Sequence, residues 1–520
     1  MTSEVSSSRL VECDVLVVGY GGAGAAAAIA ATDAGSQVIV IEKRAIGGGA
    51  TRLASGGIAV PSGPEFVDYL DTIWLGRTPR PVLERYVADA SRMVELLAEL
   101  GVETEGWAGH SQEVSVSYPP LTRPSWPKVP DGNMIRVHAK APDEEPIAPE
   151  LWAEMTNNER VWQYGRTYGI HLWAQLEASC ASRDIEVHYD TPAVRVLLGD
   201  DGEAVGVIAT RYGERVEYRA RQAVILTTGG FASNAQMKDT YLSSPFVYAG
   251  TSDYAHGDGQ RMTQVIGARM WHMQTVCGQI GFQAPGIDAA FQPRAVGESF
   301  IWVDRDGRRY VDETNEKLHN AWRLASHFDP ERVGTPGQFP RVPVYMVFDE
   351  TTRLRAPISR DWRAEGDHSW SLDNAEEVRR GWILAADTIE ELAAKTEMDP
   401  TVLAETIARF NRSCADGADA EFGRSPSSME PIVRGPFYAL PMLPMLISTH
   451  GGPEHDEDSR VVALDGEPIP RLYAAGELSS IVGWLYEAGT GHAEAIVFGR
   501  IAGQNAAALV RRPATEALAH

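Results

Sequence analysis

The sequence predicts an α/β fold whose first part contains a parallel sheet. Two short apolar runs, 14–19 (DVLVVG) and 37–42 (QVIVIE), are rich in β-branched residues, which is typical of buried strands. The alanine-rich segment 21–34 between them favours a helix that ends at Gly35. A strand, a helix and a strand in this short span suit two parallel strands joined by a right-handed crossover.

The remaining elements follow at wider spacing. The stretch 105–149 is rich in Pro and Trp and weakly periodic, so we expect it to leave the sheet. The alternating stretch 186–219, with a turn at 199–202, indicates a meander, and 223–228 (AVILTT) indicates another buried strand. We further expect helices at 162–180, 388–395, 400–411 and 494–510, and a strand at 472–475.

Composition and charge narrow the classes of function. The chain has 520 residues, of which 44% are hydrophobic and 23% charged, as in ordinary globular proteins. Lys and Arg total 47 and Asp and Glu total 71, so the formal charge is −24. Nucleic acids and anionic membranes both need a positive protein face, so neither is an expected partner.

The cysteines and the apolar runs exclude further classes. Cys13, Cys180, Cys277 and Cys414 lie far apart and match no zinc, iron–sulfur or haem spacing, so we expect reduced thiols and no metal. The polar start and the lack of eighteen consecutive apolar residues indicate neither a signal peptide nor a membrane span. We therefore expect a cytoplasmic protein.

The strongest motif is a GxGxxG run at residues 19–24, between the first strand and the helix. Gly19 permits the tight turn, Gly21 lets the backbone approach a pyrophosphate, and Gly24 lets the helix pack on the strand. Glu42 ends the next strand at a spacing that suits a ribose-binding carboxylate. This is a Rossmann-like fingerprint, compatible with NAD or FAD. The expected cofactor contacts here are Gly19, Gly21, Gly22, Ala23, Gly24, Glu42 and Lys43.

A second glycine-rich loop, 43–60, has no counterpart in a simple NAD-binding fold. Glycines there would let the backbone approach a second, bulky part of the ligand. Within it, Gly47-Gly48-Gly49-Ala50-Thr51 and Ser55-Gly56-Gly57 resemble the isoalloxazine-side loop of the fumarate reductase and 3-ketosteroid dehydrogenase flavoprotein superfamily. The resemblance continues in order along most of the chain, through 223–234, 257–268, 303–313, 449–452, 472–477 and 498–503.

The resemblance implies a Rossmann-like FAD-binding domain, 1–269 with 447–520, and an inserted α+β capping and catalytic domain, 270–446. The histidine that links flavin covalently in respiratory relatives is absent from 47–57, so it implies non-covalent FAD. Glu42 would bind the adenosine ribose, Glu477 the ribityl chain, and the helix from Gly491 would face the flavin C2 carbonyl. Further implied FAD contacts are Gly49, Ala50, Thr51, Ser55, Gly56, Gly57, Val194, Thr228, Gly229, Asn234, Asp258, Gly476 and His492.

The substrate-binding residues of true fumarate reductases are mostly absent. By motif position their arginine falls on Tyr486 and their two histidines fall on Ser448 and near Gln279. Only their arginine in the F-D-x-x-x-R segment has a match, Arg353 in FDETTR. A dicarboxylate without those cations would be poorly paired, so succinate and fumarate are disfavoured. Tyr486 and Gly489 instead resemble the ketone-binding pair of 3-ketosteroid dehydrogenases, although Glu487 stands where many relatives have Pro or Gly.

We therefore expect an FAD-dependent dehydrogenase that introduces a C=C bond α,β to the carbonyl of a cyclic ketone or 3-oxosteroid-like substrate. A base would take the α-proton, and an external acceptor such as a quinone or oxygen would reoxidise the flavin. Reduction of an activated C=C and a non-catalytic flavin-binding protein are the alternatives. Arg353 would orient a substrate carboxylate or pair with Asp349 or Glu350. The candidate bases are Tyr118, Tyr168, His171, His272 and His450.

Overall fold

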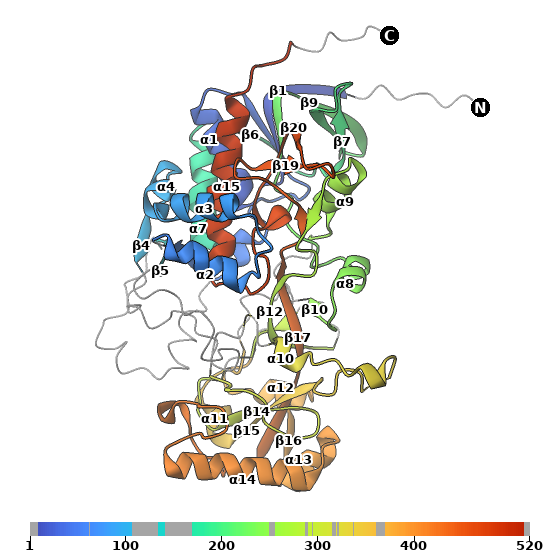
Figure 1. Ribbon diagram of the computed structural model, residues 1–520. Coiled ribbons are helices and arrows are strands. Elements are labelled where there is room, and N and C mark those ends of the chain that lie inside the picture. The colour runs from blue at the N-terminus through green and yellow to red at the C-terminus, as the bar shows by residue number, and fades with distance from the viewer. Residues whose placement is uncertain are drawn as a thin grey trace, which may run out of the picture.

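The computed structural model describes residues 9–61, 63–106, 134–140, 169–248, 255–285, 290–293, 295–314, 319, 322–335, 337–359 and 370–513. Figure 1 shows an upper part that carries both ends of the described chain and a lower part below it. The long strand β17 (Phe437–Thr449) runs between the two parts.

The upper part is a sheet of order β19-β20-β9-β1-β2-β6. Its centre is parallel, because β1 (Arg9–Val18) pairs in parallel with both β2 (Val38–Ile41) and β9 (Glu214–Leu226). β20 (Pro468–Ala474) extends it beside β9, and β6 (Glu186–His188) extends it beside β2. The predicted parallel α/β core is confirmed.

Two helices pack together on this sheet, α1 (Gly22–Asp33) and the closing helix α15 (Thr490–Ala507). Their backbones approach closely, since a Cβ built at Gly499 would lie 2.5 Å from the Ala23 carbonyl oxygen. A Cβ at Gly503 would lie 2.3 Å from that of Ala27. Glycine in α15 is therefore what allows the first and last helices to touch, and this contact closes the fold.

Two elements differ from the prediction. The expected meander strand and the strand 223–228 form one strand, β9, which pairs with antiparallel β8 (Ala204–Arg211) in its first half and with β1 along its length. The closing helix begins at Thr490, not Glu494, because Gly489 takes a φ of +90° as its N-cap. Of the helix expected at 162–180, the described part is α7 (Gly169–Ala181).

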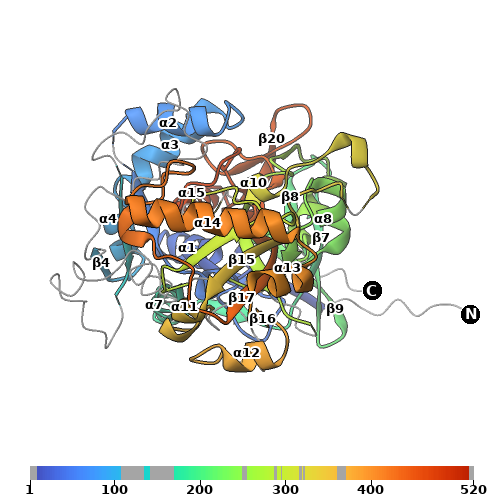
Figure 2. The ribbon, with the colours of Figure 1, turned by 90° about the horizontal axis from the view of Figure 1, so that it is seen from below.

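The lower part is built on a sheet whose strands lie in the order β13 (Ala290–Phe291), β12 (Val276–Gln283), β17, β15 (Val344–Asp349) and β14 (Phe300–Val303). β10 and β16 (Leu384–Ala386) also pair with β17. Helices α13 (Ile389–Thr396) and α14 (Pro400–Asp416) lie across strands of this sheet when it is viewed from below (Figure 2). Both predicted helices are confirmed. β10 (Val247–Tyr248), which precedes residue 270, already belongs to this sheet, so the division 1–269 with 447–520 and 270–446 stays a proposal.

The other elements have the following bounds. In the upper part they are β3 (Ile58–Pro61), α2 (Glu65–Ile73), α3 (Arg80–Ala90), α4 (Met93–Glu99), β4 (Thr104–Gly106), β5 (Met134–Ala139), β7 (Ala193–Leu198), α8 (Ala235–Tyr241), α9 (Asp258–Val265), β11 (Met270–Trp271), β18 (Gly452–Pro453), β19 (Arg460–Val462) and η4 (Gly476–Ser479). In the lower part they are α10 (Trp322–Ala325), α11 (Glu350–Arg355) and α12 (Ala375–Arg379).

Tryptophans form much of the lower core. Trp302, Trp370 and Trp382 are buried in one cluster with phenylalanines of β12 and β13. The rings of Trp370 and Trp382 lie 6.3 Å apart between centroids. The cluster gives the lower part a hydrophobic core of its own.

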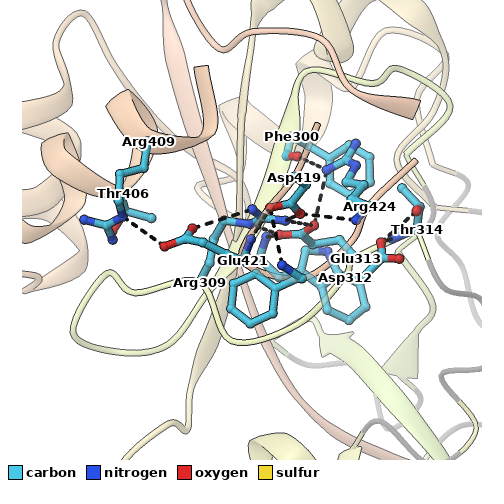
Figure 3. A network of polar contacts seen from close by, with 12 residues as sticks. Phe300, Arg309, Asp312, Glu313, Thr314, Thr406, Arg409, Asp419, Glu421 and Arg424 are labelled. Atoms are coloured by element: carbon cyan, nitrogen blue, oxygen red, sulfur yellow. Dashed lines mark hydrogen bonds and ion pairs between the residues drawn. The ribbon is translucent and has the colours of Figure 1, made fainter. Parts of the chain in front are cut away.

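A buried ionic network ties the turn after β14 to the segment after α14 (Figure 3). Arg309 forms ion pairs with Glu313 at 2.8 Å and Asp419 at 3.0 Å, and all three side chains are 0–1% exposed. Arg424, fully buried, contacts Glu313 at 3.3 Å and donates to the Phe300 carbonyl. Each charge is paired, which such burial requires.

No helix in the described ranges is long and apolar enough to cross a membrane. The four cysteines are free thiols, three of them buried. Within the same ranges, no group of three His, Cys, Asp or Glu is arranged to hold a metal ion.

Candidate active site

The first glycine-rich turn forms a tight cradle at the start of α1. Gly19 has a φ of +105°, and a Cβ there would lie 2.5 Å from the Thr227 carbonyl oxygen. A Cβ at Gly24 would lie 2.1 Å from the Gly19 carbonyl oxygen. The first turn of α1 holds no acidic residue and no side-chain cap. Its positive end is therefore suited to an anion such as a pyrophosphate.

The second glycine-rich loop lies against the first. Gly21 and Gly48 form an isolated parallel bridge, and the Gly22 N–H donates to Thr51 Oγ1 at 3.0 Å. Space remains beside this backbone, because a Cβ at Gly49 would meet nothing nearer than 3.9 Å. At Gly229 it would meet nothing within 4 Å. The two loops thus border an opening where backbone can contact an extended ligand.

Carboxylates lie at two points along this opening. Glu42, at the end of β2, accepts the N–H groups of Tyr20 at 2.8 Å and Arg44 at 3.0 Å, and burial raises its pKa. Glu477 in η4 accepts the Thr449 N–H at 3.0 Å, and burial raises its pKa to about 7. Both carboxylates are held by backbone donors, an arrangement that can present oxygens to ribose or ribityl hydroxyls.

Glycine and threonine complete the fit around Glu477. A Cβ at Gly230 would lie 2.2 Å from Glu477 Oε1, so only glycine fits there. Thr228 Oγ1, at the end of β9, is buried with no hydrogen-bond partner among the described residues. A buried hydroxyl without a partner is what a polar cofactor would satisfy. The residues present therefore fit FAD.

Three predicted FAD contacts have other observed partners, and a fourth is largely exposed. Lys43 pairs with Asp258 at 2.8 Å. Asn234 caps α8 by accepting the Met237 N–H at 3.0 Å. Val194 lies on β7 and is 58% exposed. Contacts of these four residues with the cofactor stay predictions.

The other end of the site is formed where α15 begins. Burial raises the pKa of Tyr486 well above its ordinary value, so its hydroxyl stays protonated. The Gly491 N–H points at that hydroxyl from 3.4 Å, near the limit of a hydrogen bond, and the Gly489 N–H also faces it. Gly489 is pinned by its carbonyl, which accepts the Ala59 N–H at 3.2 Å. One hydroxyl and two N–H groups therefore converge near one point.

Two histidine rings flank Tyr486. His450 stacks on it with centroids 5.3 Å apart and planes at 22°, and His319 lies 5.5 Å away at 56°. His450, predicted here, is 2% exposed. His319 was missed, because it lies in a stretch without periodicity or motif.

Behind His450 lies a hydrogen-bonded chain that sequence analysis also missed. His450 Nδ1 contacts Ser480 Oγ at 2.9 Å, and Ser480 Oγ donates to Glu494 Oε1 at 2.7 Å. The Ile481 N–H donates to Glu494 Oε2 at 2.8 Å. Burial raises the pKa of Glu494 to about 8 and lowers that of His450 to about 3.

The remaining candidates have different surroundings. The nitrogens of His272 face the Ser480 carbonyl at 3.0 Å and the Arg77 carbonyl at 3.3 Å, so both are engaged. His492 lies in the first turn of α15, and burial lowers its pKa to about 4. His171 lies on α7, on the side of the sheet with α1. Tyr118 and Tyr168 lie outside the described residues.

Arg353 is engaged within the lower part. It forms a two-point ion pair with Glu350, with both contacts at 2.6 Å, and donates to the Asp373 carbonyl. The pairing alternative is thus the one observed, and Arg353 is left out of the proposed mechanism.

The lower part reaches the loop that carries Tyr486. Arg323 of α10 packs 4.1 Å over the Trp484 ring and donates to the Trp484 carbonyl at 3.3 Å. Arg77 packs over the same ring at 4.4 Å. Trp484 therefore anchors the lower part beside the site.

A glycine cradle, a buried carboxylate held by backbone donors and a group of donors at a helix start suit a flavin-dependent oxidoreductase. The chain belongs to the FAD binding domain family, which it matches over residues 14–491. The predicted cofactor, FAD, and the predicted class of enzyme are confirmed.

The chain is also similar to individual flavoenzymes and to a solved structure. The chain is 26% identical to a probable fumarate reductase of Shewanella frigidimarina, over 95% of this chain and 74% of that protein. It is 25% identical to a 4-oxocyclohexanecarboxylate 2-dehydrogenase of Sinomonas cyclohexanicum, over 89% and 87%. The crystal structure of a 3-ketosteroid Δ1-dehydrogenase from Sterolibacterium denitrificans superposes with a TM-score of 0.78 at 22% identity, over 96% and 99%. The predicted superfamily, and its two-part fold, are confirmed.

Proposed function

We propose that this oxidoreductase introduces a C=C bond α,β to the carbonyl of a cyclic ketone or 3-oxosteroid-like substrate. The observation that carries the proposal is the convergence of the Tyr486 hydroxyl with the Gly489 and Gly491 N–H groups. A ketone oxygen placed among them would receive two or more hydrogen bonds. Such donors stabilise the negative charge that develops on the oxygen when an α-proton is removed.

The chain's own groups supply most of this chemistry. In the 3.4 Å contact the Gly491 N–H donates to the Tyr486 oxygen, so this contact does not use the Tyr486 hydroxyl proton, which can be donated to a ketone oxygen. Both groups sit at the start of α15, whose dipole also favours negative charge there. Bound FAD supplies the acceptor for the hydride that leaves the β-carbon.

The charges around the site favour a ketone over a dicarboxylate. By motif resemblance, the histidines of fumarate reductases fall on Ser448 and near Gln279, and Glu350 pairs with Arg353. A neutral or singly charged ketone needs no cationic clamp. The dehydrogenase from Sinomonas cyclohexanicum, which is similar over most of both chains, acts by its name on a cyclic ketone acid.

The second candidate is the reverse reaction, reduction of an activated C=C. The same three donors would stabilise the same enolate in that direction, and the relative from Shewanella frigidimarina is by its name a probable fumarate reductase. The direction depends on the flavin potential and on the electron partner, for which we propose a quinone or oxygen.

An anaerobic titration of the FAD-loaded protein separates the candidates. Oxidised protein receives cyclohexanone, 4-oxocyclohexanecarboxylate or a saturated 3-oxosteroid, and photoreduced protein receives the matching enones. Bleaching of the oxidised flavin by a saturated ketone supports the dehydrogenase. Rapid reoxidation by enones without such bleaching assigns the reductase. No response in either arm refutes both.

A further inference from the structure

We propose that Glu494 is the base that finally accepts the substrate's α-proton, through a relay of Ser480 and His450 that ends at His450 Nε2. The inference rests on the proposed function, whose base the ketone-binding donors do not supply. It assigns roles to two residues, Ser480 and Glu494, that no motif singled out.

Hydrogen-bond accounting gives the relay its direction. An ionised Glu494 only accepts, and it receives the Ser480 hydroxyl at 2.7 Å and the Ile481 N–H at 2.8 Å. Because the single hydroxyl proton of Ser480 is donated to Glu494, the Ser480 oxygen must accept a hydrogen bond from His450 Nδ1 at 2.9 Å. A neutral imidazole carries one proton, so Nε2 of His450 holds a free lone pair.

That lone pair has no partner in the part of the chain that the structure describes. His450 is 2% exposed, and its Nε2 is buried without a hydrogen bond among the described residues. The ring lies against Tyr486, which would hold the ketone oxygen. A buried acceptor left unsatisfied is costly, so its persistence beside the ketone-binding donors points to a proton on the ligand.

The transfer balances at every bond. The α C–H proton moves to His450 Nε2, the Nδ1 proton moves to Ser480 Oγ, and the Ser480 proton moves to Glu494 Oε1. The electron pair of the α C–H bond forms the new C=C bond, while the β-hydride leaves with its pair to oxidised FAD. The imidazole ends neutral in its other tautomer, and the carboxylate ends as a carboxylic acid.

Burial favours this route over an isolated histidine base. It lowers the pKa of His450 to about 3, so an imidazolium is disfavoured there. It raises the pKa of Glu494 to about 8, which makes the ionised carboxylate a good proton acceptor. A histidine that only exchanges tautomers can therefore pass a proton that it could not hold.

The neighbouring titratable groups do not replace the relay. His272 acts on His450 through its charge, but both its nitrogens face carbonyl groups. Glu477 raises the pKa of Glu494 through its charge and accepts from Thr449. Cys277, Glu494 and the two glycine N–H groups influence Tyr486, which Tyr86 also faces.

The test measures the rate of single-turnover flavin bleaching by the ketone that is active in the titration, as a function of pH. Wild-type protein should bleach faster as the pH rises through about 8, since Glu494 must be ionised. Ser480→Ala and Glu494→Gln should each lower the rate by about 10²-fold or more and remove this rise. Ser479→Ala is the matched control, because its buried hydroxyl donates to the Pro453 carbonyl and not to the relay.

The outcomes separate the two proposals. Variants that keep their flavin and show wild-type rates, or reduced rates with an unchanged pH profile, overturn the relay and leave the proposed function standing. If Glu494→Gln fails to bind flavin, Ser480→Ala alone decides between these results. A wild-type protein that no ketone bleaches overturns the proposed function, and the relay with it.

Discussion

Replacing Tyr486 by phenylalanine isolates one hydrogen-bond donor. Phenylalanine keeps the ring, and so keeps the stacking on His450 at 5.3 Å and the contact with His319 at 5.5 Å. Only the hydroxyl is lost, which the Gly491 N–H contacts at 3.4 Å and the Gly489 N–H also faces. The change should therefore leave the fold and the bound FAD intact.

The expected cost follows from the number of donors. Tyr486 is one of three groups that converge on the proposed oxygen position, and the two glycine N–H groups remain in the variant. Loss of one such donor typically costs about 10²–10³ in kcat, or about 2.7–4 kcal/mol of transition-state stabilisation. We expect a loss near 10²-fold, because the remaining donors still hold the oxygen.

The assay is steady-state ketone dehydrogenation with an artificial electron acceptor, with flavin absorbance as the measure of bound FAD. Tyr438→Phe is the matched control, since that hydroxyl donates to Glu350 in the lower part at 2.6 Å. The control should keep its rate within a few-fold. A Tyr486→Phe variant as active as wild type would remove Tyr486 from the mechanism and with it the observation that carries the proposed function.

Three further predictions concern the buried network, the buried carboxylate and the cradle. Arg424→Met should lower the free energy of unfolding by about 3–5 kcal/mol in a denaturant titration, because it removes one of the buried partners of Glu313. The Arg409 side chain is 39% exposed, so Arg409→Met should lower it by ~1 kcal/mol or less. Equal costs would contradict this reading of Figure 3. Glu477 has its pKa raised from 4.5 to about 7, so the stability that it contributes below pH 4.5 is lost as the pH rises through about 7. Glu477→Gln should therefore flatten the pH dependence of apoprotein melting in this window, and an unchanged slope would exclude Glu477 as its source. Gly24→Ala should lower the flavin-to-protein ratio, because its Cβ would lie 2.1 Å from the Gly19 carbonyl oxygen, and full flavin loading would show that the turn can relax.

Local signals in the sequence located the cofactor end of the site. The β-branched runs of β1 and β2, and the glycines between them, depend on neighbours a few residues away, so their structure could be predicted. Tyr486 was also found, because it stands in a motif position beside Gly489. Arg353 shows that a motif position alone does not predict a residue's contacts, since its guanidinium pairs with the neighbouring carboxylate of Glu350.

By itself, then, the sequence determined the α/β class, the nucleotide-binding turn and the family, and it singled out Tyr486 as the proposed ketone-binding tyrosine. Only the tertiary structure decided which side chains form the hydrogen-bonded chain next to Tyr486. His450 directly follows β17, Ser480 follows η4 and Glu494 lies in α15, and none of these positions carries a local pattern that predicts the others. Their contacts exist because the chain returns from the lower part along β17 and packs α15 against α1. Hydrogen bonds between residues distant in sequence depend on that packing, and burial within it sets the pKa values of His450 and Glu494.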